Sequence, residues 1–253
     1  MLHGATRVAA LYDIHGNLPA LDAVLDEVRR ALVDLIVVGG DVVPGPMPGE
    51  TMARLLGLDI PVRFISGNGE RIVLAARAGD AIDEVPPEYR DSIHWTAQHL
   101  DRESLDAMAA WSPTCTVSID GLGDVLFCHA TPRNDSDCFT RVTPEDRVRR
   151  LFAGVTAPVA VCGHTHMQFD RTAGALRIVN AGSIGAPFAP PAGAHWLLLG
   201  PDVQLRQTAY DIEDAAARMR ATGYPLVETI VIPYVLHPPP ETEMLGVYAG
   251  ADA

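Results

Sequence analysis

The stretch VAALYDIHGNLPALDAVLDEV, residues 8–28, decides the fold. Its first five residues, 8–12, form an apolar run that predicts a short buried strand. Asn17 and Pro19 then predict the start of a helix, because asparagine caps helices and proline suits their first turn. The apolar side chains of this helix recur on one face, at Leu21, Val24, Leu25, Val28 and Leu32.

A second buried strand is predicted at residues 35–38. Strand, helix and strand normally form a right-handed crossover that pairs the two strands in parallel. The carboxyl ends of both strands, marked by Asp13 and Asp41, then lie at the same edge of the sheet. Ligands of such folds bind at that edge.

The rest of the chain predicts a two-sheet protein. Apolar runs alternate with helical patterns up to about residue 70, a helical insertion is expected at about 70–110, and hairpin-like strands dominate afterwards. We therefore expect the α/β (α+β) class, as a four-layer α/β/β/α sandwich of two mixed sheets flanked by helices. Residues 1–210 are predicted to form this domain. Residues 211–253 are predicted to form a C-terminal helix and a Pro-rich tail that packs on the domain or on a partner.

Composition excludes several classes of protein. The 253 residues carry 32 Asp and Glu against 19 Lys and Arg, a formal charge of −13, which argues against binding a nucleic acid duplex. No apolar run reaches the roughly 18 to 20 residues that span a bilayer, so no membrane partner is expected. The four cysteines show no C-x-x-C spacing, and we expect a cytoplasmic protein. A homo-oligomer is left open.

Five short polar clusters follow predicted strands. In an extended segment residues i and i+2 project to the same side, so Asp13 with His15, and His164 with His166, can each present two donor atoms. Carboxylate and imidazole donors suit Mn, Fe, Zn or Ni better than Ca or Mg. The clusters are Asp13-Ile14-His15-Gly16-Asn17, Gly39-Gly40-Asp41, Gly67-Asn68, Cys128-His129 and Gly163-His164-Thr165-His166.

The order of these motifs, D-x-H, G-D, G-N, H and G-H-x-H over about residues 7–208, resembles the calcineurin-like metallophosphoesterase superfamily. The most similar members are small bacterial phosphodiesterases and dinucleoside polyphosphate hydrolases. The resemblance implies two divalent metal ions, manganese first, with Fe, Ni, Zn, Co or Mg as alternatives. A hydroxide bridging the metals would attack phosphorus. The implied ligands are Asp13, His15 and His166 for one metal, Asn68, His129 and His164 for the other, and Asp41 as the bridge, with catalytic roles for Asp13, Asp41, Asn68 and His129.

One position departs from the family pattern. Where the phosphatase branch has G-N-H-D/E, this chain has Gly67-Asn68-Gly69-Glu70, so the histidine that would protonate a leaving oxygen is missing. His94, in the helical insertion, is our preferred substitute. Glu70 is interpreted as a residue that orients Asn68.

Two further side chains are candidates for substrate binding. Asn17 is expected either to contact a phosphate oxygen or simply to cap the first helix, and Arg133 either to contact phosphate or to be a loop charge. Both alternatives stay open at each position.

The leading hypothesis is a metal-dependent phosphodiesterase acting on a small phosphate ester or nucleotide. The alternatives are a phosphomonoesterase or dinucleoside polyphosphate hydrolase, and a non-catalytic scaffold with the same fold. All seven expected ligands are present, which favours an enzyme over a scaffold.

Overall fold

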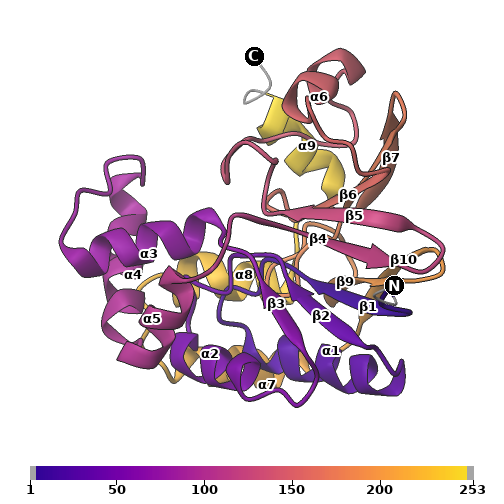
Figure 1. Ribbon diagram of the computed structural model, residues 1–253. Helices are drawn as coiled ribbons and strands as arrows, with labels where there is room; N and C mark the ends of the chain where they lie inside the picture. Colours follow the sequence, from indigo (N-terminus) through magenta and orange to yellow (C-terminus); the bar gives the residue numbers. More distant parts are fainter. Residues whose placement is uncertain (1–3, 250–253) are drawn as a thin grey trace.

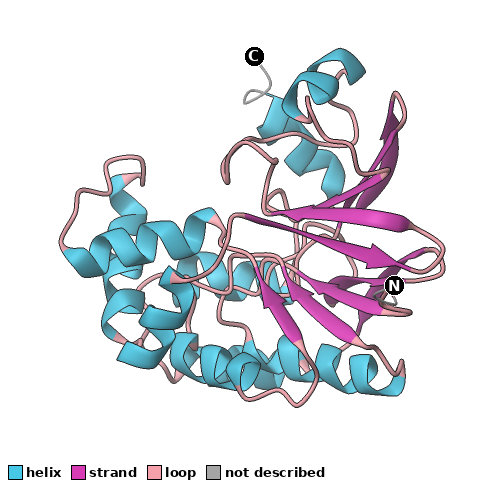
Figure 2. Cartoon of the chain, viewed as in Figure 1, coloured by secondary structure: helices cyan, strands magenta, loops and turns pink. Residues whose placement is uncertain are grey.

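Two five-stranded sheets pack face to face, with helices on their outer sides. This architecture is seen in a computed structural model that describes residues 4–249 (Figure 1, Figure 2). The predicted class, a sandwich of two mixed sheets flanked by helices, is confirmed.

The first sheet has the strand order β10-β9-β1-β2-β3. The predicted crossover is present, because β1 pairs in parallel with β2, and β2 with β3. Strand β9 runs antiparallel to β1 and joins β10 to the sheet. The bounds are β1 Val8–Leu11, β2 Leu35–Val38, β3 Val62–Phe64, β9 Ala194–Leu199 and β10 Val203–Thr208.

The second sheet has the order β4-β5-β6-β8-β7. Its central strands β5, β6 and β8 are parallel, and the outer strands β4 and β7 are antiparallel to their neighbours. Strand β7 was not predicted, because Asp170 and Thr172 interrupt the apolar signal on its exposed side. The bounds are β4 Thr114–Ile119, β5 Gly123–Cys128, β6 Val159–Cys162, β7 Phe169–Ala173 and β8 Leu176–Asn180.

Successive side chains of β1 point to opposite faces of the sheet, so this strand contributes to two separate layers of the core. Val8 and Ala10 face the second sheet, where they meet apolar side chains such as Phe127 and Val161. Ala9 and Leu11 face the opposite way, toward the apolar stripe of helix α1, Leu18–Arg30. A run that is buried on both faces is typical of a central parallel strand.

The predicted helical insertion consists of three separate helices. They are α3, Asn68–Ala78, α4, Pro87–Gln98, and α5, Arg102–Ala109, and Asp101 caps the last of them. All three lie beside one end of the sheets (Figure 1). Helix α2, Pro48–Leu56, lies on the outer side of the first sheet with α1.

Helix α6, Glu145–Leu151, covers the outer face of the second sheet. The sequence Thr143-Pro144-Glu145-Asp146 predicts a helix with Pro144 at its first position, but the helix begins one residue later, at Glu145. The Thr143 hydroxyl oxygen, just before the helix, accepts a hydrogen bond from the Thr140 N–H at 2.9 Å.

The C-terminal segment packs on the rest of the chain. Apolar side chains from α7 to α8 contact Met47 and Trp95, and Met244 of α9 packs with Met167 and Phe188. The elements are α7 Ile212–Arg220, a π-helical turn η1 Val227–Val231, α8 Ile232–Leu236 and α9 Glu241–Ala249. Between residues 4 and 249, none of the helices combines the length and the apolar character needed to cross a membrane.

Candidate metal centre

The predicted ligands come together in two adjacent groups. Asp13, His15 and His166 form one group, and Asp41, His129 and His164 the other, and within each group the donor atoms lie within 4.8 Å of one another. The remaining predicted ligand begins helix α3. Its side-chain oxygen, Asn68 Oδ1, lies 3.1 Å from His129 Nε2.

Asp41 lies between the two groups. Its Oδ1 is 3.4 Å from His129 Nε2, and its Oδ2 is 3.8 Å from His15 Nε2. Each carboxylate oxygen therefore faces the histidine of a different group. Asp41 can therefore offer one oxygen to each group.

The imidazole rings are oriented by backbone carbonyls. In His15, His129 and His166 the Nδ1 atom lies 3.2, 2.9 and 2.8 Å from a carbonyl oxygen, so Nδ1 donates and carries the proton. The lone pair of Nε2 is then directed at the centre, as metal-binding histidines require. The carbonyls belong, in the same order, to Pro44, Gly39 and Ala186.

One carboxylate oxygen of Asp13 is not satisfied by a hydrogen bond from the described residues and can bind a cation. Its Oδ2 accepts the His164 N–H at 2.8 Å, whereas Oδ1 is buried and has no hydrogen-bond partner among residues 4–249. A buried, unpartnered carboxylate oxygen is costly unless a cation or donor satisfies it. Because Oδ1 lies 3.5 Å from His166 Nε2, the residues present fit a metal ion at this point.

Burial keeps part of the histidine set neutral. It lowers the pKa of His164 to about 4, and burial together with the neighbouring His166 lowers the pKa of His15. Neutral imidazoles at pH 7 offer lone pairs to a metal without first losing a proton.

The backbone at the site is left-handed. Of the six non-glycine residues with positive φ in the described part of the chain, five are candidate ligands. The expectation of extended i, i+2 pairs is therefore wrong, although both pairs do present their donors to one point. Each such residue costs roughly 1–2 kcal/mol, and strain of this kind gathers at functional sites. The five are Asp13, His15, Asp41, His164 and His166, with φ between 48° and 68°.

Residues 7–199 match the family model for the calcineurin-like phosphoesterase superfamily domain. The chain belongs to this superfamily. Membership makes it a phosphoesterase, and hence a hydrolase, of a family that uses divalent metal ions.

One curated protein and two solved structures illustrate what this chain is similar to. The chain is 26% identical to an uncharacterized protein of Methanocaldococcus jannaschii over 178 residues, which is 70% of this chain and 69% of that protein. It is similar to the crystal structure of a metallophosphoesterase from Sphaerobacter thermophilus, with 26% identity, a TM-score of 0.69 and coverage of 92% and 100% of the two chains. A hypothetical protein from Pyrococcus horikoshii shares the fold, with 21% identity, a TM-score of 0.77 and coverage of 92% and 99%.

In the phosphoesterase, Glu70 holds the loop that carries Asp41, a role that we did not infer from the sequence. The buried Glu70 carboxylate accepts backbone N–H groups of Asp41, Val42 and Gly67 at 2.9, 2.7 and 2.8 Å. It fastens the loop that carries Asp41 to the turn that carries Asn68, in place of the expected contact with Asn68 itself. The signal was present, because a glutamate three residues after a cap is typical of a capping box.

Close packing explains the missing histidine of the phosphoesterase. A Cβ at Gly69 would collide with the carbonyl oxygen of Val43, and the Gly69 N–H donates to Asp41 Oδ1 at 2.7 Å. The Asp41 loop occupies the space that a side chain at position 69 needs. Glycine is required here by the local packing.

The three predicted substrate contacts lie in different surroundings. Asn17 caps α1, and its Nδ2 donates to Gly185 O at 3.0 Å and to Tyr210 Oη at 3.1 Å, which engages both of its N–H groups. Arg133 is exposed and pairs with Asp137 at 2.7 Å. His94 is exposed on α4, outside the residues that line either of the cavities at the site. The structure therefore brings none of these three side chains into the two ligand groups.

Two cavities flank the centre of the phosphoesterase. One, of about 260 Å³, reaches His15 and His166 of the first group. The other, of about 560 Å³, reaches His129 of the second group and includes Arg71 and Arg133. The two ligand groups therefore lie between two separate spaces for a ligand.

Proposed function

We propose that this chain is a metal-dependent phosphodiesterase with two divalent ions, manganese first, that hydrolyses a small phosphate ester or nucleotide. The observation that carries the proposal is the position of Asp41, whose two oxygens face His129 and His15 of the two groups at 3.4 and 3.8 Å. Asp13, His15 and His166 would hold one ion, and Asn68, His129 and His164 the other. Asp41 would serve both.

Divalent ions at these positions would supply Lewis-acid charge and a hydroxide nucleophile at neutral pH. The chain contributes orientation: three carbonyls fix the imidazole rings, and Glu70 fixes the loop of Asp41. Two carboxylates leave part of the cation charge uncompensated. That local positive charge would attract a phosphate in a protein whose formal charge is −13.

The two cavities favour a diester over a monoester. A diester carries an organic group on each side of its phosphorus, and one cavity reaches each ligand group. A monoester would fill only one of them. A space for each ester arm supports diester hydrolysis as the preferred reaction.

The test combines metal analysis with a substrate pair. We expect about two metal ions per chain after loading with manganese, and faster hydrolysis of bis-p-nitrophenyl phosphate than of p-nitrophenyl phosphate. Asp41→Asn should lose metal and activity, whereas the exposed Asp59→Asn on the same chain should keep both.

Faster turnover of the monoester would favour a phosphomonoesterase. Metal-free protein without turnover on either substrate would favour a scaffold. Cytoplasmic location and oligomeric state stay predictions.

A further inference from the structure

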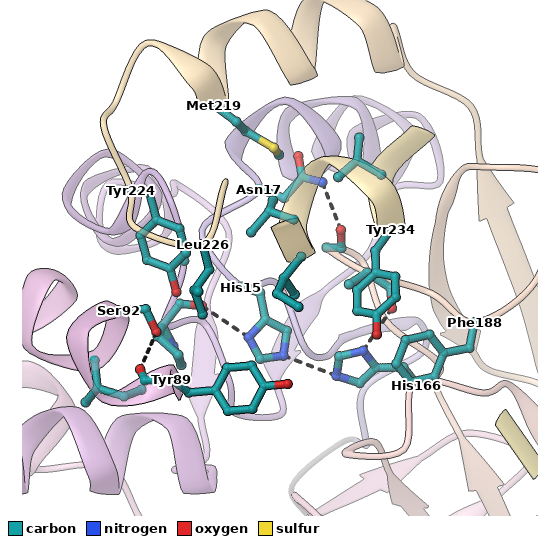
Figure 3. A pocket seen from close by; sticks show the side chains of 18 residues that line it. His15, Asn17, Tyr89, Ser92, His166, Phe188, Met219, Tyr224, Leu226 and Tyr234 are labelled. Atoms are coloured by element: carbon teal, nitrogen blue, oxygen red, sulfur yellow. Dashed lines mark hydrogen bonds between the residues drawn. The ribbon is translucent and has the colours of Figure 1, made fainter. Parts of the chain in front are cut away.

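The smaller cavity is built from three distant parts of the chain. Helix α4 contributes Tyr89, Ser92 and Ile93, the loop after β8 contributes residues 185, 186 and 188, and the C-terminal segment contributes residues between 219 and 235. Figure 3 shows these side chains surrounding a space next to the His15–His166 pair. The C-terminal segment therefore forms a wall of the candidate active site.

The walls of this cavity are uncharged. None of its 18 lining residues in the described chain is Lys, Arg, Asp or Glu, and aliphatic side chains from the C-terminal segment, including Leu226, Ile230 and Val231, form much of the surface. The π-helical turn η1 carries Ile230 and Val231 to the cavity. Away from the His15–His166 edge, a second phosphate group entering here would lose its hydration and meet no cationic side chain.

Aromatic rings complete the lining. Phe188 stacks on His166 with ring centroids 5.0 Å apart, and Tyr234 meets the edge of Phe188 at 5.7 Å. The ring of Tyr89 extends into the space near His15 (Figure 3). Flat rings packed in these stacked and edge-on arrangements are the surroundings that a further aromatic ring prefers.

Two hydroxyl groups are available to a bound molecule. The Ser92 hydroxyl is engaged, because it donates to the Tyr89 carbonyl oxygen at 2.6 Å. The phenol oxygens of Tyr89 and Tyr234 line the cavity without a hydrogen-bond partner in the part of the chain that the structure describes. They offer polar contacts at the rim of an otherwise apolar space.

We propose that this cavity binds an aromatic ring in one ester group of the substrate, and that the segment from Tyr224 to Val235 selects that group. The inference rests on the proposed function, since it places the phosphate at the His15–His166 edge. The volume of about 260 Å³ lies just below the range of ordinary ligand pockets, roughly 300–1,000 Å³. It therefore suits a single ring system, and its uncharged walls disfavour a polyphosphate chain.

The test measures binding without turnover. Titration calorimetry of the manganese-loaded protein would compare phenylphosphonate, methylphosphonate and hexylphosphonate, which share the anionic head. We expect phenylphosphonate to bind about 10- to 100-fold more tightly than methylphosphonate, because the ring adds five buried carbons. Equal affinities for these two would overturn the inference. Tighter binding of hexylphosphonate than of phenylphosphonate would overturn the choice of an aromatic ring.

A matched pair of variants locates the effect. Val231→Trp fills the cavity and should abolish the preference for phenylphosphonate over methylphosphonate. Val247→Trp, at a position that is 63% exposed on α9, should keep the preference. If Val231→Trp fails to fold, methyl resonances of Ile230 and Val235 in the wild-type protein should shift on adding phenylphosphonate, and unshifted resonances would refute the site.

The outcomes separate this inference from the proposed function. If the protein prefers phenylphosphonate but hydrolyses no ester, the cavity assignment is supported and the proposed phosphodiesterase activity is refuted. If the protein hydrolyses diesters but does not prefer phenylphosphonate, the proposed activity is supported and the cavity assignment is refuted.

Discussion

Replacing Glu70 by glutamine tests how the site is held together. The carboxylate accepts four backbone N–H groups, with Oε2 bonded to Asp41 and Gly67 and Oε1 to Val42 and Val43. Glutamine keeps one oxygen and presents an NH₂ group to the other pair of donors. Two buried N–H groups would then lose their acceptor, at about 1–3 kcal/mol each, so the expected loss of stability is about 2–6 kcal/mol.

The measurement is best made at pH 8. Burial and the neighbouring Asp41 carboxylate raise the pKa of Glu70 to about 7, so the wild-type side chain is ionised there. Urea unfolding of metal-free protein gives the free energy of unfolding, and metal titration gives the affinity. We expect manganese affinity to fall about 10- to 100-fold, as for other groups that orient metal ligands.

Glu50→Gln provides the control for this experiment, because Glu50 is exposed on α2. Glu50→Gln should change neither the free energy of unfolding nor the manganese affinity. A Glu70→Gln variant whose unfolding free energy stays within about 0.5 kcal/mol of the wild type, with unchanged metal affinity, would refute the role assigned to Glu70.

Three further predictions concern the packing around Gly69, the stability of the protein at low pH and its stabilisation by manganese. Gly69→Ala should cost at least about 2 kcal/mol in urea unfolding, because its Cβ meets the Val43 carbonyl, whereas Gly246→Ala, with open space around it, should be neutral or stabilising. Burial lowers the pKa of His195 to about 4, below its ordinary 6.5, so the unfolded chain gains a proton first and stability falls as pH drops from 6.5 toward 4. His195→Phe should remove up to about 3 kcal/mol of that acid sensitivity in unfolding measured across this window. Manganese at 100 times its Kd should raise Tm by about 5–10 °C and EDTA should reverse the rise, and an unchanged Tm would contradict a metal site.

The elements that the sequence predicted well are those governed by local pattern. Residues 8–12 and 35–38 are short apolar runs, and β1 and β2 occupy them almost residue for residue. Asn17 marks the start of α1 because capping acts over three residues, as its bond to the Ala20 N–H shows. The polar clusters at the strand ends were predictable for a related reason, since parallel strands bring their carboxyl ends to one edge. The division of these residues into two ligand sets came from the family resemblance.

What escaped prediction depends on contacts between distant segments. Left-handed φ at Asp13 or His164 has no composition signal, because it is imposed by the surrounding loops. Gly69 was noticed only as an absent histidine, since its reason is the Val43 carbonyl, which lies on another loop. The exposure of His94 follows from the direction in which α4 packs, and periodicity alone does not decide which face of a short helix meets the site.

The candidate site draws on two parts of the chain. All seven predicted ligands lie within residues 7–199, the part that matches the superfamily model. Seven of the residues that line the smaller cavity, from Met219 to Val235, lie beyond it. If this cavity holds an ester group as proposed, changes in the C-terminal segment would alter which ester group is accepted without disturbing the ligands. On this proposal, the motifs identify the phosphoesterase family, and the choice of substrate would depend on the segment after residue 210.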